Sequence, residues 1–260
     1  MSEQEPSPGD TFVQSFARGL AVIRSFDARA PAQTLSEVAL RTGLTRAGAR
    51  RILLTLEHLG YVQCEGRQFT LTPRILDLGF AYLSSQPLWQ VAEPEIEALV
   101  AVVKESSSVS VLEGADIIYV MRVPTHKIMS INLGVGSRLP AHCTSMGRVL
   151  LGGLPDDQVL ALLEANPPTA FTSHTVTEPT AVLSAIRQAR ATGWCLVNQE
   201  LEEGLVSIAA PITDRAGNVV AALNVSGQYN RTPPKVMRDR LLPPLLDASQ
   251  RISKLLLMRP

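Results

Sequence analysis

The sequence predicts an α+β chain: an N-terminal winged helix-turn-helix, a linker helix, and a C-terminal α/β domain with a mainly antiparallel sheet. Three observations support this prediction. Two short amphipathic helical patterns flank Gly43, alternating strand-like segments occupy 61–72, and further helix and strand patterns fill 88–260. With 260 residues, 45% of them hydrophobic and 18% charged, the chain is long enough for two cores.

The N-terminal end divides into a polar tail and a first helix. Residues 1–10 are rich in Ser, Glu and Pro, and we expect this tail to be disordered. Apolar residues then recur at helical spacing and predict a supporting first helix: Val13, Phe16, Leu20, Ile23 and Phe26.

Capping residues delimit the two helices that follow. Thr34 and Glu37 have the spacing of a capping box, which satisfies free amides at a helix start. Gly43 is suited to end that helix in the left-handed conformation, and Thr45 is a good cap for the next one. The segment therefore predicts two helices joined by a tight turn.

The second of these helices has two chemically different faces. Apolar residues gather on the face predicted to be buried: Ala49, Ile52, Leu53, Leu56 and Leu59. The candidate DNA contacts lie at the helix start and on the opposite face: Thr45, Arg46, Ala47, Arg50, Arg51 and Leu54. A helix of this kind after a short helix and turn fits a DNA major groove. The alternative is a helical hairpin with a solvated basic face, and Leu54 has the alternative of packing under the wing.

The wing and the local charge favour DNA. Residues 61–64 and 68–72 read as two strands around a turn at 65–67, which places Arg67 at the tip, within reach of phosphate or the minor groove. Residues 45–74 contain five arginines against two glutamates, whereas the whole chain carries 24 basic and 24 acidic residues. Positive charge confined to one domain is expected when only that domain meets phosphate.

A linker helix is predicted after the wing. Thr72 and Pro73 are suited to cap it and to occupy its first turn, and helical spacing continues to a break at 84–87. The apolar positions of this helix are Ile75, Leu78, Gly79 and Tyr82. Such a stripe packs either on a second copy of the chain, as two DNA half-sites require, or on the protein's own first helix.

The remainder alternates between helix and strand patterns. Helices are expected at 88–105, 144–151, 155–164, 179–192 and 245–257, and strands at 106–112, 116–123, 128–135, 194–198, 205–212 and 219–226. Pro94 is compatible with the first of these helices only in its first turn or at a kink. About six strands flanked by helices are typical of small-molecule sensor domains.

Several classes of protein are not expected. The cysteines Cys64, Cys143 and Cys195 have neither paired nor metal-ligand spacing, which favours a reducing, cytoplasmic setting without disulfides or bound metal. No signal peptide or membrane-spanning run is present. No cofactor is expected, because the glycines at 134–136 lack a dinucleotide-binding pattern. No base and orienting acid are recognisable around His142, so catalysis is not expected either.

Two segments carry a family resemblance. Residues 136–151 read GSRLPAHCTSMGRVLL, and residues 193–205 run from Gly-Trp to Glu-Glu-Gly-Leu. With the winged helix and linker before them, they resemble IclR-type bacterial transcriptional regulators over about residues 12–258. The segments at 12–20, 44–47 and 105–112 are similar to the branch that controls aromatic-acid breakdown through the β-ketoadipate pathway.

The resemblance implies a division of labour along the chain. It implies a DNA-binding domain at 11–72, a linker helix at 73–87 and a GAF-like effector domain at 88–260. The partners it implies are double-stranded DNA with a palindromic operator, a small organic acid, and further copies of the chain in a dimer or dimer of dimers. Protocatechuate, 4-hydroxybenzoate and β-ketoadipate are all compatible with the branch. The alternative is a hydrolase-like enzyme with an accessory winged helix.

The residues implied to bind the effector are Ser145, Met146, Ser207, Asn224 and Ser226. Backbone amides after Thr144 are suited to a carboxylate, and neutral side-chain donors hold an anion without the cost of burying a lysine. Met146 stands where other family members carry a small residue, which changes the shape of the site. Arg148 is expected at the surface, with neutralisation of a ligand carboxylate as the alternative.

Overall fold

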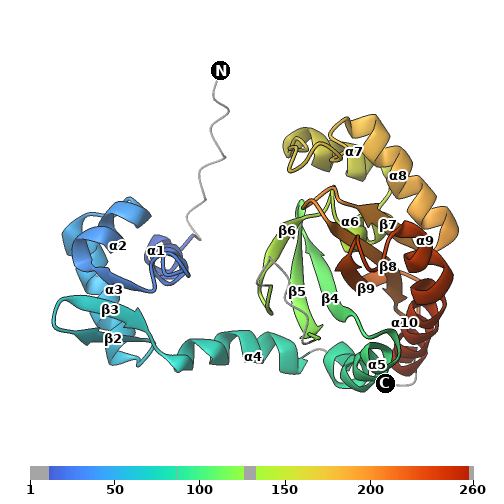
Figure 1. The fold of residues 1–260 in the computed structure, drawn as a ribbon. Helices are drawn as coiled ribbons and strands as arrows, with labels where there is room; N and C mark the ends of the chain where they lie inside the picture. The colour runs from blue at the N-terminus through green and yellow to red at the C-terminus, as the bar shows by residue number, and fades with distance from the viewer. Residues whose placement is uncertain (1–11, 86, 126–132, 258–260) are drawn as a thin grey trace. The chain divides into compact units, whose positions relative to one another are not determined.

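The computed structural model describes residues 12–85, 87–125 and 133–257, so the expected tail at 1–10 lies outside it. The chain forms two compact units that divide between Tyr82 and Leu83 (Figure 1). Each unit has its own hydrophobic core.

The N-terminal unit is a winged helix-turn-helix, as predicted. Its elements are α1 (Gln14–Arg24), β1 (Ala32–Thr34), α2 (Leu35–Thr42), α3 (Arg46–His58), β2 (Val62–Glu65) and β3 (Gln68–Leu71). The three strands form an antiparallel sheet in the order β1-β3-β2. The short strand β1 was not predicted; it pairs with the outer side of the wing hairpin through a register that places Gln33 opposite Phe69.

The predicted caps are present. The Thr34 hydroxyl accepts a hydrogen bond from the Glu37 amide, and the Glu37 carboxylate accepts one from the Thr34 amide at 2.7 Å. Gly43 ends α2 with φ of +65°, and the Thr45 hydroxyl accepts a bond from the Gly48 amide at 3.1 Å. These bonds satisfy backbone donors that the helix ends leave free, so the turn between α2 and α3 is fixed locally.

Two parts of the predicted apolar faces are wrong. Phe16 is 68% exposed, and Val13 and Leu20 are also exposed; of the predicted positions only Ile23 and Phe26 reach the core, beside Val22. Leu59 is exposed because α3 ends one residue before it. The first half of α1 therefore presents apolar side chains that its own domain does not cover.

The linker begins as predicted. The Thr72 hydroxyl caps a short 3-10 turn, η1 (Pro73–Ile75), which leads into α4 (Leu76–Ser85). Of the predicted stripe, Ile75 lies in η1 and is half-buried, whereas Leu78 and Tyr82 are about half exposed on α4. Leu76 and Phe80, which were not part of the stripe, are more exposed still. The alternative of packing on the first helix is not seen, since α1 and α4 both leave apolar residues uncovered, and packing on a second copy stays a prediction.

The C-terminal unit is built on a six-stranded antiparallel sheet in the order β6-β5-β4-β9-β8-β7 (Figure 1). The strands are β4 (Ser106–Glu113), β5 (Asp116–Val123), β6 (Arg138–Pro140), β7 (Cys195–Asn198), β8 (Leu205–Thr213) and β9 (Val219–Gln228). This confirms the predicted antiparallel sheet of an α+β protein.

Helices cover both faces of this sheet. One face packs against α5 (Pro87–Val103) and α10 (Leu242–Leu257), which follows α9 (Pro234–Val236) and the π-turn η2 (Met237–Leu241). The other face packs against α6 (Ser145–Leu151), α7 (Asp156–Ala165) and α8 (Pro179–Thr192). The short α6 lies directly on the strands, so its first turn faces the sheet.

Three details differ from the predicted elements. The strand expected at 128–135 falls mostly outside the described residues, and Leu133–Val135 are not in a strand; β6, three residues long, was missed. Pro94 is the eighth residue of α5, beyond the first turn. The last helix begins at Leu242, earlier than expected and directly after η2, so that Pro243 and Pro244 are its second and third residues. None of the described helices combines the length and apolarity needed to cross a bilayer.

Candidate functional site

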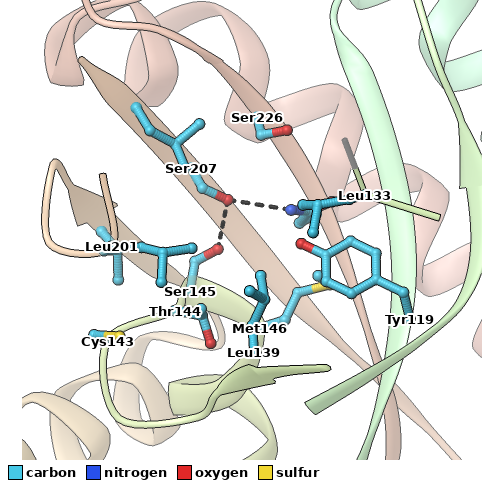
Figure 2. Close-up of a pocket in the computed structure, with 13 residues that line it drawn as sticks. Tyr119, Leu133, Leu139, Cys143, Thr144, Ser145, Met146, Leu201, Ser207 and Ser226 are labelled. Carbon is cyan, nitrogen blue, oxygen red and sulfur yellow. Dashed lines mark hydrogen bonds between the residues drawn. The ribbon is translucent and has the colours of Figure 1, made fainter. Parts of the chain in front are cut away.

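A cavity lies between the first turn of α6 and the sheet face beneath it. Its space is about 440 Å³ including the open mouth. The residues that line it come from β5, β6, β7, β8, β9, α6 and the loops beside them: Tyr119, Leu133, Leu139, Cys143, Thr144, Ser145, Met146, Val197, Leu201, Leu205, Ser207, Asn224 and Ser226 (Figure 2). All five residues that the resemblance implied for effector binding are among them.

Polar side chains meet at the centre of this cavity. The hydroxyl oxygens of Ser145 and Ser207 lie 2.7 Å apart, and the Asn224 amide nitrogen donates to the Ser207 oxygen at 3.2 Å (Figure 2). Ser207 stands directly opposite Ser226 in the β8–β9 ladder, and Asn224 is two residues from Ser226 on β9. The prediction that these three residues share one face of a hairpin is confirmed.

The orientation of the Asn224 amide is fixed by the sheet. Its oxygen Oδ1 accepts a hydrogen bond from the Ser108 backbone amide at 3.0 Å. The nitrogen Nδ2 is therefore the end that reaches Ser207 and the cavity, and one of its two hydrogens is left for another acceptor. Asn224 is buried, so this donor is held in place rather than solvated. The cavity consequently presents a fixed, neutral donor.

The first turn of α6 is held tightly over the cavity. The Thr144 hydroxyl accepts a bond from the Gly147 amide at 3.2 Å and donates to the Pro140 carbonyl at 3.0 Å. This cap does not use the amides of Ser145 and Met146. A side chain at Gly147 would collide with the backbone of Ala141, so glycine allows the loop and helix to touch. Local backbone contacts thus position Ser145.

Met146 and Tyr119 shape the rest of the cavity. Met146 is buried, and its sulfur accepts a hydrogen bond from the Ser110 hydroxyl at 3.2 Å. The Tyr119 hydroxyl is directed toward the Ser145–Ser207 pair (Figure 2), and burial raises its pKa to about 12, which keeps it a neutral donor. Tyr119 was missed by the sequence reasoning; the alternation of β5 shows only that it shares a face with Ile117.

The apolar walls were missed as well. They consist of five aliphatic side chains from separate segments: Leu133, Leu139, Val197, Leu201 and Leu205. A ring or an aliphatic chain can pack against such walls while its polar end meets the serines and Asn224. The site therefore combines one polar centre with an apolar surround.

Arg148 is not at the surface, contrary to the prediction. Its guanidinium donates to both carboxylate oxygens of Glu200 at 2.7 and 2.6 Å, and to the His142 carbonyl at 2.8 Å. Both side chains are buried, at 4% and 9% exposure. Glu200, which sequence reasoning did not single out, lies 52 residues from Arg148 and is brought to it only by the fold.

The residues next to the cavity are not set up for nucleophilic chemistry. Burial, together with the nearby Glu200 carboxylate, raises the pKa of the Cys143 thiol to about 12, and burial raises that of Cys195 to about 11. Burial also lowers the pKa of His142, whose Nε2 faces the Thr169 carbonyl. Within the described ranges, no group of three or more His, Cys, Asp or Glu side chains is placed to hold a metal ion.

The predicted DNA contacts are accessible. All seven are exposed: Thr45, Arg46, Ala47, Arg50, Arg51, Leu54 and Arg67. Ala49 and Leu53, on the other face of α3, are fully buried, which confirms the two-faced helix. None of these four arginines forms an ion pair with another residue that the structure describes. Among the residues that the structure describes, nothing therefore neutralises these four guanidinium groups.

Comparison with known proteins agrees with this architecture. Residues 15–66 match the IclR helix-turn-helix domain, and residues 80–254 match the bacterial transcriptional regulator IclR C-terminal domain. The chain is 45% identical over 240 residues to a Pca regulon regulatory protein from Pseudomonas putida, covering 92% of this chain and 82% of that one. It is 33% identical to a p-hydroxybenzoate hydroxylase transcriptional activator from Acinetobacter baylyi, covering 95% and 93%.

A solved structure resembles it as well. An IclR homologue from Microbacterium hydrocarbonoxydans, complexed with 4-hydroxybenzoate, is 26% identical with a TM-score of 0.82, covering 93% of this chain and 98% of that one. These relatives are regulators rather than enzymes, so the hydrolase-like alternative is set aside. The family models match both units of the chain, the helix-turn-helix unit and the C-terminal effector domain. The chain therefore belongs to the IclR family of DNA-binding bacterial transcriptional regulators.

Proposed function

We propose that this regulator controls genes of aromatic-acid breakdown and that its effector is a small organic acid bound in the α6 cavity. Residues 11–72 act as the DNA-binding domain, 73–87 as the linker and 88–260 as the effector domain. The effector is an aromatic acid or a ring-cleavage product, of which protocatechuate, 4-hydroxybenzoate and β-ketoadipate are the leading candidates. Three relatives named above support this choice: a Pca regulon regulatory protein, a p-hydroxybenzoate hydroxylase transcriptional activator, and an IclR homologue complexed with 4-hydroxybenzoate.

The observation that carries the proposal is the fixed orientation of Asn224. Because Ser108 occupies Oδ1, the group that faces the cavity is a donor, and the Ser145, Ser207 and Tyr119 hydroxyls lie around it. A carboxylate is an acceptor at both oxygens and pairs with such donors without a buried countercharge. The aliphatic walls then receive the carbon skeleton.

The DNA-binding half of the proposal rests on α3 and the wing. An exposed arginine face on the second helix of the motif is placed to enter a major groove, while Arg67 contacts the backbone or the minor groove. Two copies are required for a palindromic operator, so we propose a homodimer or a dimer of dimers. The acid favours one arrangement of the effector domains and, through α4, changes the distance between the two DNA-binding domains of the dimer.

Removing one arginine from α3 tests the DNA half. Arg50→Ala is expected to weaken operator binding by about 1–3 kcal/mol and to relax selectivity at one base pair, if this side chain reads a guanine. The fold should be unaffected, because the side chain is exposed. Titration of the operator and of single-base-pair variants of it measures the loss of affinity and the loss of selectivity. The salt dependence of the same binding reports the number of phosphate contacts. Unchanged operator selectivity would remove Arg50 from the reading face.

Reversing the polarity of one amide tests the effector half. Asn224→Asp keeps an oxygen for the Ser108 amide but replaces the donor in the cavity with a negative charge. We expect the variant to bind operator normally and to lose its response to the acid. Calorimetric titration with the acid that most raises the melting temperature of the wild type, chosen from the three candidates, measures this loss.

Asn230→Asp provides the matched control, because Asn230 is exposed just after β9, does not line the cavity, and undergoes the same chemical change. A normal response of Asn224→Asp would show that the acid binds elsewhere. A wild type that none of the acids stabilises would instead overturn the choice of effector class.

A further inference from the structure

The ion pair between Arg148 and Glu200 stands next to the cavity but does not line it. It is the one ion pair among the described residues in which both side chains are buried. In each of the other ion pairs between described residues, at least one side chain is more than one third exposed. Removing two charges from water is costly, and apolar residues of similar size often serve stability equally well. A role in stability alone therefore does not account for this pair.

The pair joins the two walls that enclose the cavity. Arg148 lies one turn after Ser145 on α6, and it also holds the His142 carbonyl in the loop before that helix. Glu200 directly precedes Leu201, which lines the cavity together with Leu205 at the other end of the same loop. The distance between α6 and the 199–205 loop is therefore set by one bidentate contact.

The 199–205 loop has little else to hold it to α6. Two of its bonds are internal: the Gln199 amide donates to the Leu205 carbonyl at 2.8 Å, and the Gly204 amide donates to the Gln199 side chain at 2.9 Å. The Gly204 carbonyl also accepts a bond from the Tyr229 amide at 2.7 Å, which ties the loop to the end of β9 but not to α6. Gln199 has φ of +61°, an uncommon value for a residue other than glycine. The loop is a preformed turn between the paired strands β7 and β8, and Glu200 provides its ion pair to α6.

Glu200 also connects the cavity wall to the loop between α7 and α8. Its carboxylate accepts a bond from the Val176 amide at 3.1 Å, and its backbone carbonyl accepts one from the Thr175 hydroxyl at 2.5 Å. The Thr172 hydroxyl donates to the Gln199 carbonyl at 2.6 Å. Three segments that are distant in sequence thus meet at one carboxylate.

We propose that Arg148 and Glu200 are positioning residues for the effector: their ion pair fixes the 199–205 loop against α6 and so sets the width of the cavity. This inference deepens the proposed function and rests on it for the identity of the ligand. Without the pair, Leu201 and Leu205 lose their fixed distance from Ser145, and the acid has to order the wall as it binds. That ordering weakens binding without removing any contact to the acid.

The test replaces the pair by apolar side chains of similar size, Arg148→Met with Glu200→Leu. We expect the double variant to stay folded but to unfold at a lower denaturant concentration, because the His142 carbonyl and the Val176 amide lose their partners, and to bind operator within about threefold of the wild type. Its affinity for the acid chosen from the three-compound panel should fall at least tenfold. Arg148→Lys, which keeps the charge but loses the bidentate contact, should give an intermediate loss.

Hydrogen exchange provides a readout that needs no ligand. In the double variant the amides of Gln199, Gly204 and Leu205 should exchange at least tenfold faster, while those in the β8–β9 ladder keep wild-type protection. A matched control is Asp156→Asn, which breaks the exposed contacts to Arg187 and Arg190 in the same unit and should change neither loop exchange nor affinity.

Two results would overturn the inference in any folded variant, the double variant or Arg148→Lys. One is hydrogen exchange in the 199–205 loop at the wild-type rate, and the other is wild-type affinity for the acid. If the wild type binds none of the acids, the proposed effector class fails, whereas the exchange experiment still decides whether the pair positions the loop.

Discussion

Phe80→Glu is expected to separate the chains and to weaken operator binding about 100-fold. Phe80 is 69% exposed on α4, and Leu76 on the same side of the helix is 70% exposed. Leu78 points to the opposite side, so α4 is apolar on more than one face, which is unusual for a helix that stays in water. Burying such side chains against a second copy contributes about 1.5–3 kcal/mol for each.

In the proposed dimer, a charge at Phe80 would have to be buried between the two copies of α4 without a partner. Losing the dimer turns a two-point attachment to a palindromic operator into a single one, and linked binding sites commonly gain 100-fold or more from the second contact. Sedimentation velocity and operator titration measure the two effects separately. Leu40→Glu, at a more exposed apolar site of the same unit, is the control for self-association. A Phe80→Glu protein that sediments and binds operator like the wild type would exclude α4 from the interface.

The fold was predictable from the sequence where signals are local. The Thr34–Glu37 capping box, Gly43 and the Thr45 cap each depend on a few neighbouring residues, and all three appear in the structure. The same holds for α8, whose predicted ends coincide with the observed ones, because Pro179 begins it and Gly193 ends it in the left-handed conformation. Local chemistry is sufficient for such elements.

Other features depend on contacts that no local pattern contains. The helical spacing in α1 shows an apolar face but not whether its own domain or another chain covers it, and the exposed Phe16 shows that its own domain does not. The cavity residues Ser145, Ser207 and Asn224 came from the family resemblance. Tyr119 and the Arg148–Glu200 pair had no local signal, because what identifies them is their position in the finished sheet and its loops.

Gly147→Ala is expected to destabilise the C-terminal unit by about 1–3 kcal/mol, and its effector binding should be lost. Alanine favours helices by about 1 kcal/mol over glycine, so propensity alone predicts the opposite sign. The packing of this helix decides the outcome: a Cβ on Gly147 would lie 2.2 Å from the Ala141 carbonyl oxygen and 2.3 Å from its Cα. These are backbone atoms, which cannot swing aside as the end of a side chain does.

Relief of this collision requires α6 to move away from the loop before it. That movement displaces Ser145, and with it the hydroxyl that contacts Ser207 at the centre of the cavity. Calorimetry should therefore show a lower melting temperature for the effector unit, while operator binding by the winged helix persists. Gly134→Ala is the control, because a Cβ there meets no atom within 4 Å and the glycine needs no positive φ. If Gly147→Ala instead melts higher than the wild type and still binds the acid, α6 is free to shift, and the tight contact with Ala141 is not what positions Ser145.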